Sequence, residues 1–349
     1  MHRHPTPTRV LLVLLLLCHS GCYYSHLASG QLKLLWLRQP IQEAIEDPAH
    51  PEQTRELLRL VESVRRFARD LGLRVDGQYT SYVDWPADRI VTTLVRTRPG
   101  SLEAVPHWYP IVGDLPYKGY FDQRRAEAEA ERLRAEEGFD VCVSAITAYS
   151  TLGWLDDPVT SPMLARGAAS LVETLFHELV HATAFLDDEA DFNESAAQFI
   201  GQQASIRFFE GLSLKSAGRL PEASSVRDAI EDRRAIAAVI QSFRDLLLEI
   251  EDADERAGRR ANAEAKVREE LAALPLRALD PERVATGARL SDSCLALRGT
   301  YIRDLPRHAQ VLTALGGDLE AMIARLAEWA DRNRPTEDFF RVEEGNESG

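Results

Sequence analysis

The sequence predicts a predominantly helical α+β protein, in which a small sheet is followed by a pair of apolar helices and a long C-terminal helical hairpin. Short β-branched and aromatic segments are concentrated between residues 81 and 149. Two apolar segments with helical spacing follow at 162–186 and 193–213. A charge-rich stretch with a narrow apolar stripe then covers about 221–276. These three observations favour the α+β class.

Residues 1–21 have the features of a signal peptide. Arg3 and Arg9 precede the nine-residue apolar run Val10–Cys18, which is shorter than the roughly 20 residues needed to span a bilayer. Small residues follow, just before Cys22. This arrangement resembles a bacterial lipoprotein signal, in which the cysteine is diacylated and becomes the mature N-terminus. Ordinary secretion, with cleavage at a nearby small residue, is the alternative.

Either form of processing places the mature chain, residues 22–349, outside the cytoplasm. As a lipoprotein, the chain would belong to the cell envelope, face the periplasm and contact the membrane through a lipid anchor on Cys22. Tyr23, rather than Asp, follows Cys22 and favours the outer over the inner membrane.

The composition excludes some classes of protein. The chain has 349 residues, 45% of them hydrophobic and 28% charged, which is typical of a globular protein. A formal net charge of −14 argues against binding to nucleic acid. Four cysteines are too few for a disulfide scaffold. Cys142 and Cys294 either form a bridge, which an oxidising compartment permits, or are two buried free thiols.

The first half of the mature chain reads as helices followed by strands. Residues 29–72 look helical, with a break at Pro40. A strand is expected over Ile90–Val95 and a second, short one over Trp108–Gly113. A solvated amphipathic helix at 122–137 and an apolar strand over Phe139–Tyr149 complete a βαβ-like layer, with the sheet edge near Tyr149.

The hairpin at 221–276 has an apolar stripe in its first half and a polar helix at 251–274 in its second. Such a pair packs through a narrow seam, and its charge runs are most simply solvated faces. The stripe consists of Ile230, Ile236, Val239, Ile240, Phe243, Leu247 and Ile250.

Two histidines lie four residues apart in the first apolar helix, in the pattern His177-Glu178-x-x-His181. Residues at i and i+4 share one helical face. Two imidazole nitrogens can therefore bind one Zn²⁺ ion at about 2 Å. Glu178 lies next to the first histidine, where it can take a proton from a water molecule held by the ion. The pattern predicts one catalytic zinc ion with Glu178 as the general base.

A hydrolytic zinc site needs a third protein ligand. No histidine occurs between residues 181 and 308, so a carboxylate is expected. We favour Glu194, with Asp191 as the alternative, because Glu194 opens the second apolar helix and a ligand on a helix is better pre-organised. Without a metal, Asp191 or Asn193 would cap this helix and Glu194 would be a first-turn acid. The candidate carboxylates are Glu194 at the start of the second helix and, in the turn before it, Asp187, Asp188, Glu189 and Asp191.

With His177-Glu178-x-x-His181 followed by Asn193-Glu194, the chain resembles the gluzincin metallopeptidases. More closely, it resembles a family of bacterial putative aminopeptidases that are predicted to be zinc-dependent lipoproteins. The resemblance implies a zincin-type active-site helix pair within a zinc metallopeptidase domain at 22–349, acting on a peptide substrate in the cell envelope. The likeness runs along most of the mature chain, and it rests on the segments 21–24, 117–121, 148–158, 174–181 and 192–195.

The chain departs from the family in three places. Trp108 and Asp114 stand where the family has a cysteine pair, which implies a lost disulfide. Ser291-Asp292, ahead of Tyr301, replaces an Asn-Asn pair ahead of a tyrosine. The Gly-Ala-Met-Glu-Asn element, with which many gluzincin aminopeptidases hold a free amino terminus, is absent. Exopeptidase action therefore does not follow from the sequence.

A tetrahedral oxyanion needs a hydrogen-bond donor besides the metal. Tyr149, Tyr301 and His308 are the candidates for this role or for substrate binding. The strand that ends at Ala148–Thr151 can bind an extended peptide by strand addition, or it is a sheet edge covered by a loop. The chain is thus expected to be a zinc-dependent peptidase.

Two other functions fit the same residues. One is a zinc amidohydrolase that acts on a cell-wall component. The other is a lipid-anchored helical scaffold with a non-catalytic metal site, in which the hairpin is the working surface. Glu178 argues against the scaffold, because a purely structural metal needs no base beside it.

Overall fold

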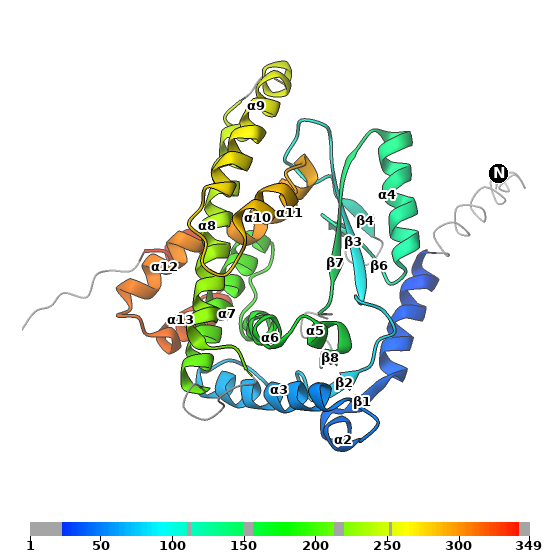
Figure 1. Ribbon diagram of the computed structural model, residues 1–349, viewed down its shortest axis with the longest axis vertical. Helices are drawn as coiled ribbons and strands as arrows, with labels where there is room; N and C mark the ends of the chain where they lie inside the picture. Colours follow the sequence, from blue (N-terminus) through cyan, green and yellow to red (C-terminus); the bar gives the residue numbers. More distant parts are fainter. Residues whose placement is uncertain (1–22, 110–112, 149–155, 213–219, 251–252, 342–349) are drawn as a thin grey trace, which may run out of the picture.

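The molecule consists of a small sheet region and a larger helical body, and its central helices lie between the two (Figure 1). The computed structural model describes residues 23–109, 113–148, 156–212, 220–250 and 253–341. Helices predominate among the described residues, so the predicted α+β class is confirmed. In that part of the chain no helix is both long enough and apolar enough to cross a membrane.

The predicted helical region at 29–72 is divided by a strand. A helix at 23–36 leads into β1 (Arg38–Pro40), which pairs antiparallel with β2 (Ser81–Val83). On its other side β2 pairs parallel with β8 (Val159–Thr160). The helices α2 (Ile41–Glu46) and α3 (Glu52–Asp70) follow β1, and α3 buries its apolar face in the main core. Pro40 therefore ends an edge strand, where a missing N–H is tolerated, rather than breaking a helix.

The central sheet has the order β6-β3-β7. Its middle strand β3 (Val91–Thr97) is antiparallel to both β6 (Lys118–Tyr120) and β7 (Asp140–Ile146). Helix α4 (Gln123–Glu137) connects β6 to β7 and packs its alanines and Leu133 against the sheet. A βαβ-like unit is therefore present, with β3 between its two parallel strands, but its first strand is β6, which was not predicted from the sequence. Within the described residues β6 and β7 are the two edge strands of this sheet.

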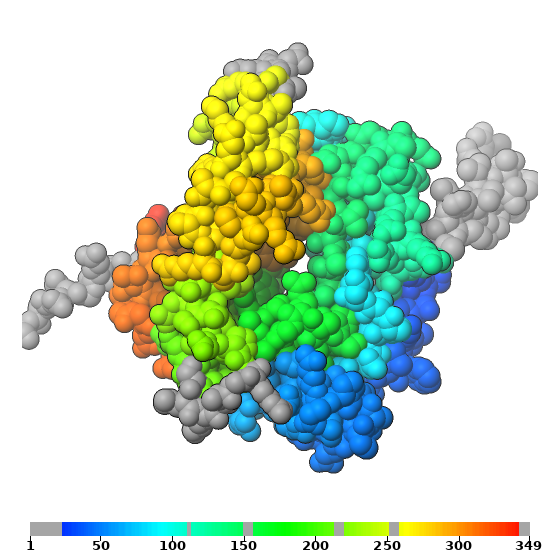
Figure 2. Space-filling model, viewed as in Figure 1, coloured from blue at the N-terminus to red at the C-terminus, as the bar shows by residue number. Residues whose placement is uncertain are grey.

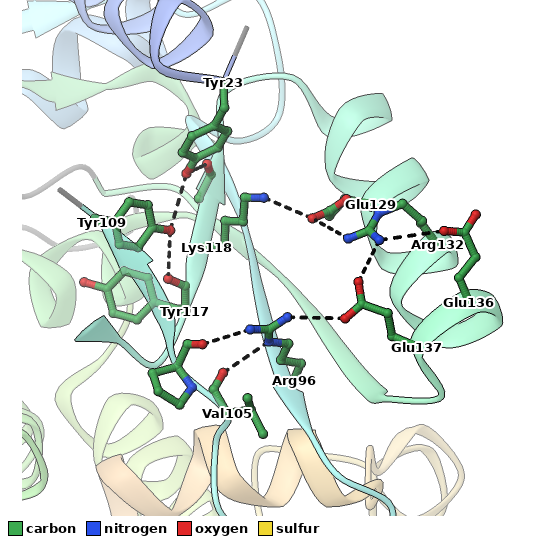
Figure 3. Close-up of polar contacts among 12 residues, drawn as sticks. Tyr23, Arg96, Val105, Tyr109, Tyr117, Lys118, Glu129, Arg132, Glu136 and Glu137 are labelled. Atoms are coloured by element: carbon green, nitrogen blue, oxygen red, sulfur yellow. Dashed lines mark hydrogen bonds and ion pairs between the residues drawn. The ribbon is translucent and has the colours of Figure 1, made fainter. Parts of the chain in front are cut away.

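The expected single strand over Trp108–Gly113 is wrong. Two strands form there, β4 (His107–Tyr109) and β5 (Gly113–Leu115), and they pair antiparallel. Trp108 lies directly opposite Asp114, as the positions of a cysteine pair would require. The hydroxyl of Tyr109 donates to the carbonyl of Tyr117, which ties this hairpin to the chain entering β6 (Figure 3).

The two apolar helices lie at the centre of the molecule. The first is shorter than predicted, because α5 (Ser161–Ala165) and α6 (Ala168–Thr183) are separated at Gly167, which has a φ of +84°. A residue with a side chain would be strained there. The second helix is α7 (Ala190–Leu212). Both helices are apolar on most sides and contribute Phe176 and Phe199 to the main core, since other helices cover them.

The predicted hairpin is confirmed as α8 (Ala223–Leu248) and α9 (Ala253–Ala272). Its seam consists of Val239, Ile240, Phe243, Leu247, Val267 and Leu271. Ile230, at the start of the stripe, instead joins the main core. The helices that follow are α10 (Pro281–Gly287), α11 (Asp292–Ile302), α12 (Leu305–Ala314), α13 (Leu319–Asp331) and α14 (Thr336–Phe339). Helix α11 lies between the hairpin and the sheet (Figure 1).

A disulfide joins Cys142 of β7 to Cys294 of α11, with their Cα atoms 5.0 Å apart. Of the two alternatives that the sequence left open, the bridge is therefore the one that forms. It links positions 152 residues apart and constrains the unfolded chain, an effect that typically contributes about 2–5 kcal/mol. The bridge fixes the edge strand to the helix that carries Tyr301.

Candidate metal centre and active site

Three electron-pair donors converge where α6 meets α7. The Nε2 atoms of His177 and His181 lie 3.1 Å apart. Glu194 Oε2 lies 3.2 Å from the first nitrogen and 3.6 Å from the second. These residues form the group of His, Cys, Asp and Glu side chains in the described structure that could hold a metal ion. They are the three ligands that the sequence favours.

The connection between the two helices positions Glu194. Asn193 is buried, and its side chain pairs with both backbone groups of Leu186: its amide donates to the carbonyl at 2.7 Å, and its oxygen accepts from the N–H at 3.0 Å. This pair closes the turn in the way that a backbone pair would. Glu194 consequently faces back toward the two histidines. Because α7 begins at Ala190, neither Asp191 nor Asn193 is its cap.

A glycine allows the two helices to approach closely. A Cβ atom on Gly201 of α7 would lie 3.0 Å from the backbone nitrogen of His177 and 3.2 Å from its Cα. Both neighbours belong to the backbone of α6 and cannot rotate away. One turn before His177 on α6, the Glu173 carboxylate accepts a hydrogen bond from the Gln198 amide of α7 at 3.0 Å.

The spacing of the three donors fits a zinc ion. Ligands at 2.0–2.1 Å in a tetrahedral arrangement stand about 3.3 Å from one another. The observed separations of 3.1, 3.2 and 3.6 Å bracket that value. Glu194 Oε2 is buried and has no hydrogen-bond partner among the described residues. An unpaired buried carboxylate oxygen facing two ring nitrogens is compatible with a cation between them.

The electrostatics of the cluster agree with this geometry. Burial would raise the pKa of Glu194, but the adjacent His177 and His181 rings outweigh this effect and lower the pKa to about 2. Burial would likewise lower the pKa of His177, yet Glu194, Glu178 and Glu173 together raise it. The Glu194 carboxylate is therefore ionised before any cation binds, and the pKa of His177 responds to its charge.

An open cleft of about 690 Å³ leads to the cluster. Its walls are the end of β7, one face of α6, the start of α8 and the ring of Tyr301. The space-filling view shows a hollow over α6 between the hairpin and the sheet (Figure 2). Glu178 lines this cleft and makes no hydrogen bond or ion pair within the described residues. Its carboxylate is therefore available to a molecule in the cleft.

A comparison with protein families assigns the chain to a family. A family model described as putative aminopeptidase matches residues 22–339, most of the chain. The chain belongs to the putative aminopeptidase family. Membership supports a peptidase function and a peptide substrate. No curated protein and no solved structure matches the chain.

The structure separates the remaining candidates in this family member. Asp191 lies outside the ligand cluster, because its carboxylate pairs with Arg303 at 2.8 Å. Tyr301 lines the cleft and stacks on His177, with ring centroids 6.3 Å apart. Burial, followed by the charges of Glu194, Glu178 and Tyr117, raises the pKa of Tyr301, so its phenol stays protonated and can donate. Tyr149 and Cys22 lie outside the described residues.

His308 is not in the cleft, which removes it as an oxyanion donor. It is completely buried in the helical body, and its Nε2 lies 3.1 Å from Ser195 Oγ. Burial lowers its pKa to about 3. Its ring packs among Phe192, Phe199, Phe339 and Phe340. Sequence position alone could not reveal this, because those aromatic rings come from α7 and from the C-terminal segment.

Two tyrosines near the site were missed by the sequence reasoning. Burial and then the Glu194 charge raise the pKa of Tyr117, whose phenol therefore lies within electrostatic range of the candidate metal ligands. Tyr79 is fully buried, and burial followed by the charge of Glu178 raises its pKa. Its φ of +60° is strained for an aromatic residue. Tyr117 belongs to the segment 117–121, which carries part of the family resemblance. That resemblance was the sequence signal that could have identified Tyr117 as a residue near the site.

Proposed function

We propose that the protein is a zinc-dependent peptidase of the bacterial cell envelope. The observation that carries the proposal is the convergence of His177 Nε2, His181 Nε2 and Glu194 Oε2 at the spacing of tetrahedral zinc ligands. Membership in the putative aminopeptidase family supports the substrate class. Aminopeptidase action in particular is an expectation from the family description.

The residues of the cleft divide the work of peptide hydrolysis. When bound, the ion supplies Lewis-acid activation of a water molecule and of the scissile carbonyl. Glu178 accepts the proton of the attacking water and returns it to the leaving amine. The Tyr301 hydroxyl donates a hydrogen bond to the oxygen on which negative charge develops. Glu178 thus carries one proton from the water to the amine, and Tyr301 keeps its own proton while it donates the hydrogen bond.

The edge strand β7 supports a peptide over a non-peptide substrate. Ala145 and Ile146 at its end, and Thr147 and Ala148 beyond it, line the cleft beside His177 and Glu178. The unpaired edge of a strand offers N–H and C=O groups at the spacing of an extended peptide. A substrate bound along this edge would place its backbone next to the metal cluster.

The location is part of the proposal. The features of residues 1–22 support a lipoprotein signal with Cys22 as the lipid anchor, facing the periplasm. The disulfide between Cys142 and Cys294 is compatible with such a compartment, because disulfides persist in oxidising surroundings.

Metal content and activity of the mature chain, residues 22–349, test the proposal. Elemental analysis should find about one zinc per chain in the wild type, and His177→Ala and Glu194→Ala should lose it. Glu178→Gln should keep the zinc and lose roughly 10²- to 10⁴-fold in peptide hydrolysis. Asp191→Ala is the matched control, since that carboxylate pairs with Arg303.

Several outcomes would contradict the proposal. A folded wild type that takes up no zinc would favour the scaffold. Zinc retained in Glu194→Ala but lost in Asp191→Ala would move the third ligand. Turnover of cell-wall amides but not of peptides, measured side by side, would make the protein an amidohydrolase.

A further inference from the structure

The part of the cleft away from the metal cluster carries two arginines. Arg166 precedes α6, and Arg233 lies on α8 across the cleft. Both line the same cavity as His177, Glu178 and Tyr301. A positively charged end is notable in a chain whose formal net charge is −14.

Each arginine contacts one polar side chain of α6. The Arg166 Nε donates to Ser170 Oγ at 3.2 Å. Arg233 forms an ion pair with Glu173, whose other oxygen accepts from the Gln198 amide at 3.0 Å. Ser170 and Glu173 are three residues apart and so lie on neighbouring turns of one helical face. The same face continues to His177.

The positions of Ser170 and Glu173 on α6 give the approximate distances of the two arginines from His177. With a rise of 1.5 Å per residue, Glu173 lies about 6 Å and Ser170 about 10 Å along the axis from His177. An extended peptide covers about 3.3–3.6 Å per residue. The two guanidinium groups therefore lie about two or three substrate residues from the bond to be cleaved.

The charges at this end favour an anion over a cation. Arg166 and Arg233 contribute two positive charges against the single negative charge of Glu173. Both oxygens of Glu173 already have partners, Gln198 and Arg233, so a substrate ammonium group would meet an acid whose charge is already paired. Within the described residues, the contact with Glu173 uses only one terminal nitrogen of Arg233. A guanidinium has five N–H donors, which leaves capacity for a carboxylate.

We propose that Arg166 and Arg233 form a specificity subsite for a substrate carboxylate, two or three residues from the scissile bond. The inference rests on the proposed peptidase function and names its substrate class: short peptides with a free C-terminus, or peptides with an Asp or Glu side chain at that distance. The chemistry of the subsite is the same for both sources. The substrate's other groups would lie along β7.

Matched peptides test the subsite and distinguish the two sources of the carboxylate. One set keeps a neutral sequence and compares the free C-terminal acid with the amide at two to four residues from the cleaved bond. A second set has amidated ends and places Glu or Gln at the same positions. Mass spectrometry locates the cleavage and gives kcat/KM for each peptide. The carboxylate member of at least one pair should be cleaved about 10- to 100-fold faster than its neutral partner.

Variants assign the preference to the two arginines. Arg166→Gln and Arg233→Gln should each reduce the preference at least about fivefold. Both should leave kcat/KM for the neutral peptides and the zinc content unchanged. Arg227→Gln is the matched control on α8, because Arg227 pairs with Glu210 and does not line the cleft. An unchanged preference in both test variants would overturn the assignment.

A binding measurement separates failure of the subsite from failure of the peptidase function. Fluorescence anisotropy of a labelled short peptide acid and its amide, on the Glu178→Gln protein, needs no turnover. Preferred binding of the acid without cleavage in the wild type would keep the subsite and reject the peptidase. Cleavage with equal rates for acid, Glu, amide and Gln peptides would keep the peptidase and reject the subsite. Neither cleavage nor acid-selective binding would reject both.

Discussion

Tyr301 and Tyr117 bring two phenol groups into the electrostatic range of the same carboxylate, Glu194. They come from distant parts of the chain, one from α11 and the other from the segment before β6. Only Tyr301 lines the cleft and stacks on His177. At the scale of single residues, the geometry therefore favours Tyr301 as the hydrogen-bond donor to the developing oxyanion.

Replacing Tyr301 by Phe removes the hydroxyl and leaves the ring. We expect kcat for peptide hydrolysis to fall about 10²-fold, since loss of one oxyanion donor typically costs that much, with zinc content unchanged. Tyr117→Phe should have a smaller effect, below about tenfold, and Tyr24→Phe serves as a control outside the cleft. Wild-type kcat in Tyr301→Phe would remove this residue from the mechanism.

At the scale of elements, the contact between α6 and α7 decides whether three ligands can meet. Glu194 is two turns from Gly201 on α7, and Gly201 touches the backbone of His177. Two helices that pack this closely require a residue without a Cβ at the crossing. The separation of His177, His181 and Glu194 therefore depends on Gly201, which is not itself one of the candidate ligands.

Gly201→Ala should push the two helices apart. We expect a loss of about 1–3 kcal/mol in the free energy of unfolding, as for other overpacked sites, and weaker zinc binding. Gly211→Ala on the same helix is the matched control, because a Cβ there meets nothing within 4 Å. That control should be neutral or slightly stabilising, since Ala favours helix over Gly. Urea unfolding and a competitive zinc titration measure both effects, and equal behaviour of the two variants would contradict the expectation.

At the scale of the whole molecule, two buried histidines in different parts of the structure make the free energy of unfolding depend on pH. His308 lies in the helical body and His107 in the β4–β5 hairpin. Burial, then Arg307, lowers the pKa of His308 to about 3. Burial, then Arg96 and Lys118, lowers the pKa of His107 to about 4. Both are therefore neutral in the folded protein at pH 7.

Because each folded pKa lies below the unfolded value of about 6.5, the unfolded state binds more protons in between. Stability from these groups is complete above about pH 6.5 and is lost as the pH falls toward 4 and then 3. The slope is up to about 1.4 kcal/mol per pH unit for each histidine. Urea unfolding of the metal-free protein between pH 7 and 4 should show this loss.

His308→Gln should be less stable at pH 7 but should show a shallower decline with falling pH than the wild type. Identical slopes for wild type and variant would contradict the assignment of this pH dependence to His308.

The sequence by itself determined the features that depend on local spacing. Helical periodicity located α3, α4, α7 and the α8–α9 hairpin. The pattern from His177 to His181 placed two donors on one helical face, and the lack of a nearby histidine pointed to a carboxylate such as Glu194. These features were accessible because a repeat of 3.6 residues, or a ligand pair at i and i+4, is a property of one continuous segment.

Only the tertiary structure decided what distant segments do together. It paired Cys142 with Cys294, folded the expected strand over Trp108–Gly113 into a hairpin, and buried His308 among aromatic rings. It also brought Arg166 and Arg233 to one cleft with His177 and Glu178. No local pattern encodes such contacts, because they depend on how close two packed backbones can come. At the centre of this protein the missing Cβ of Gly201 sets that distance.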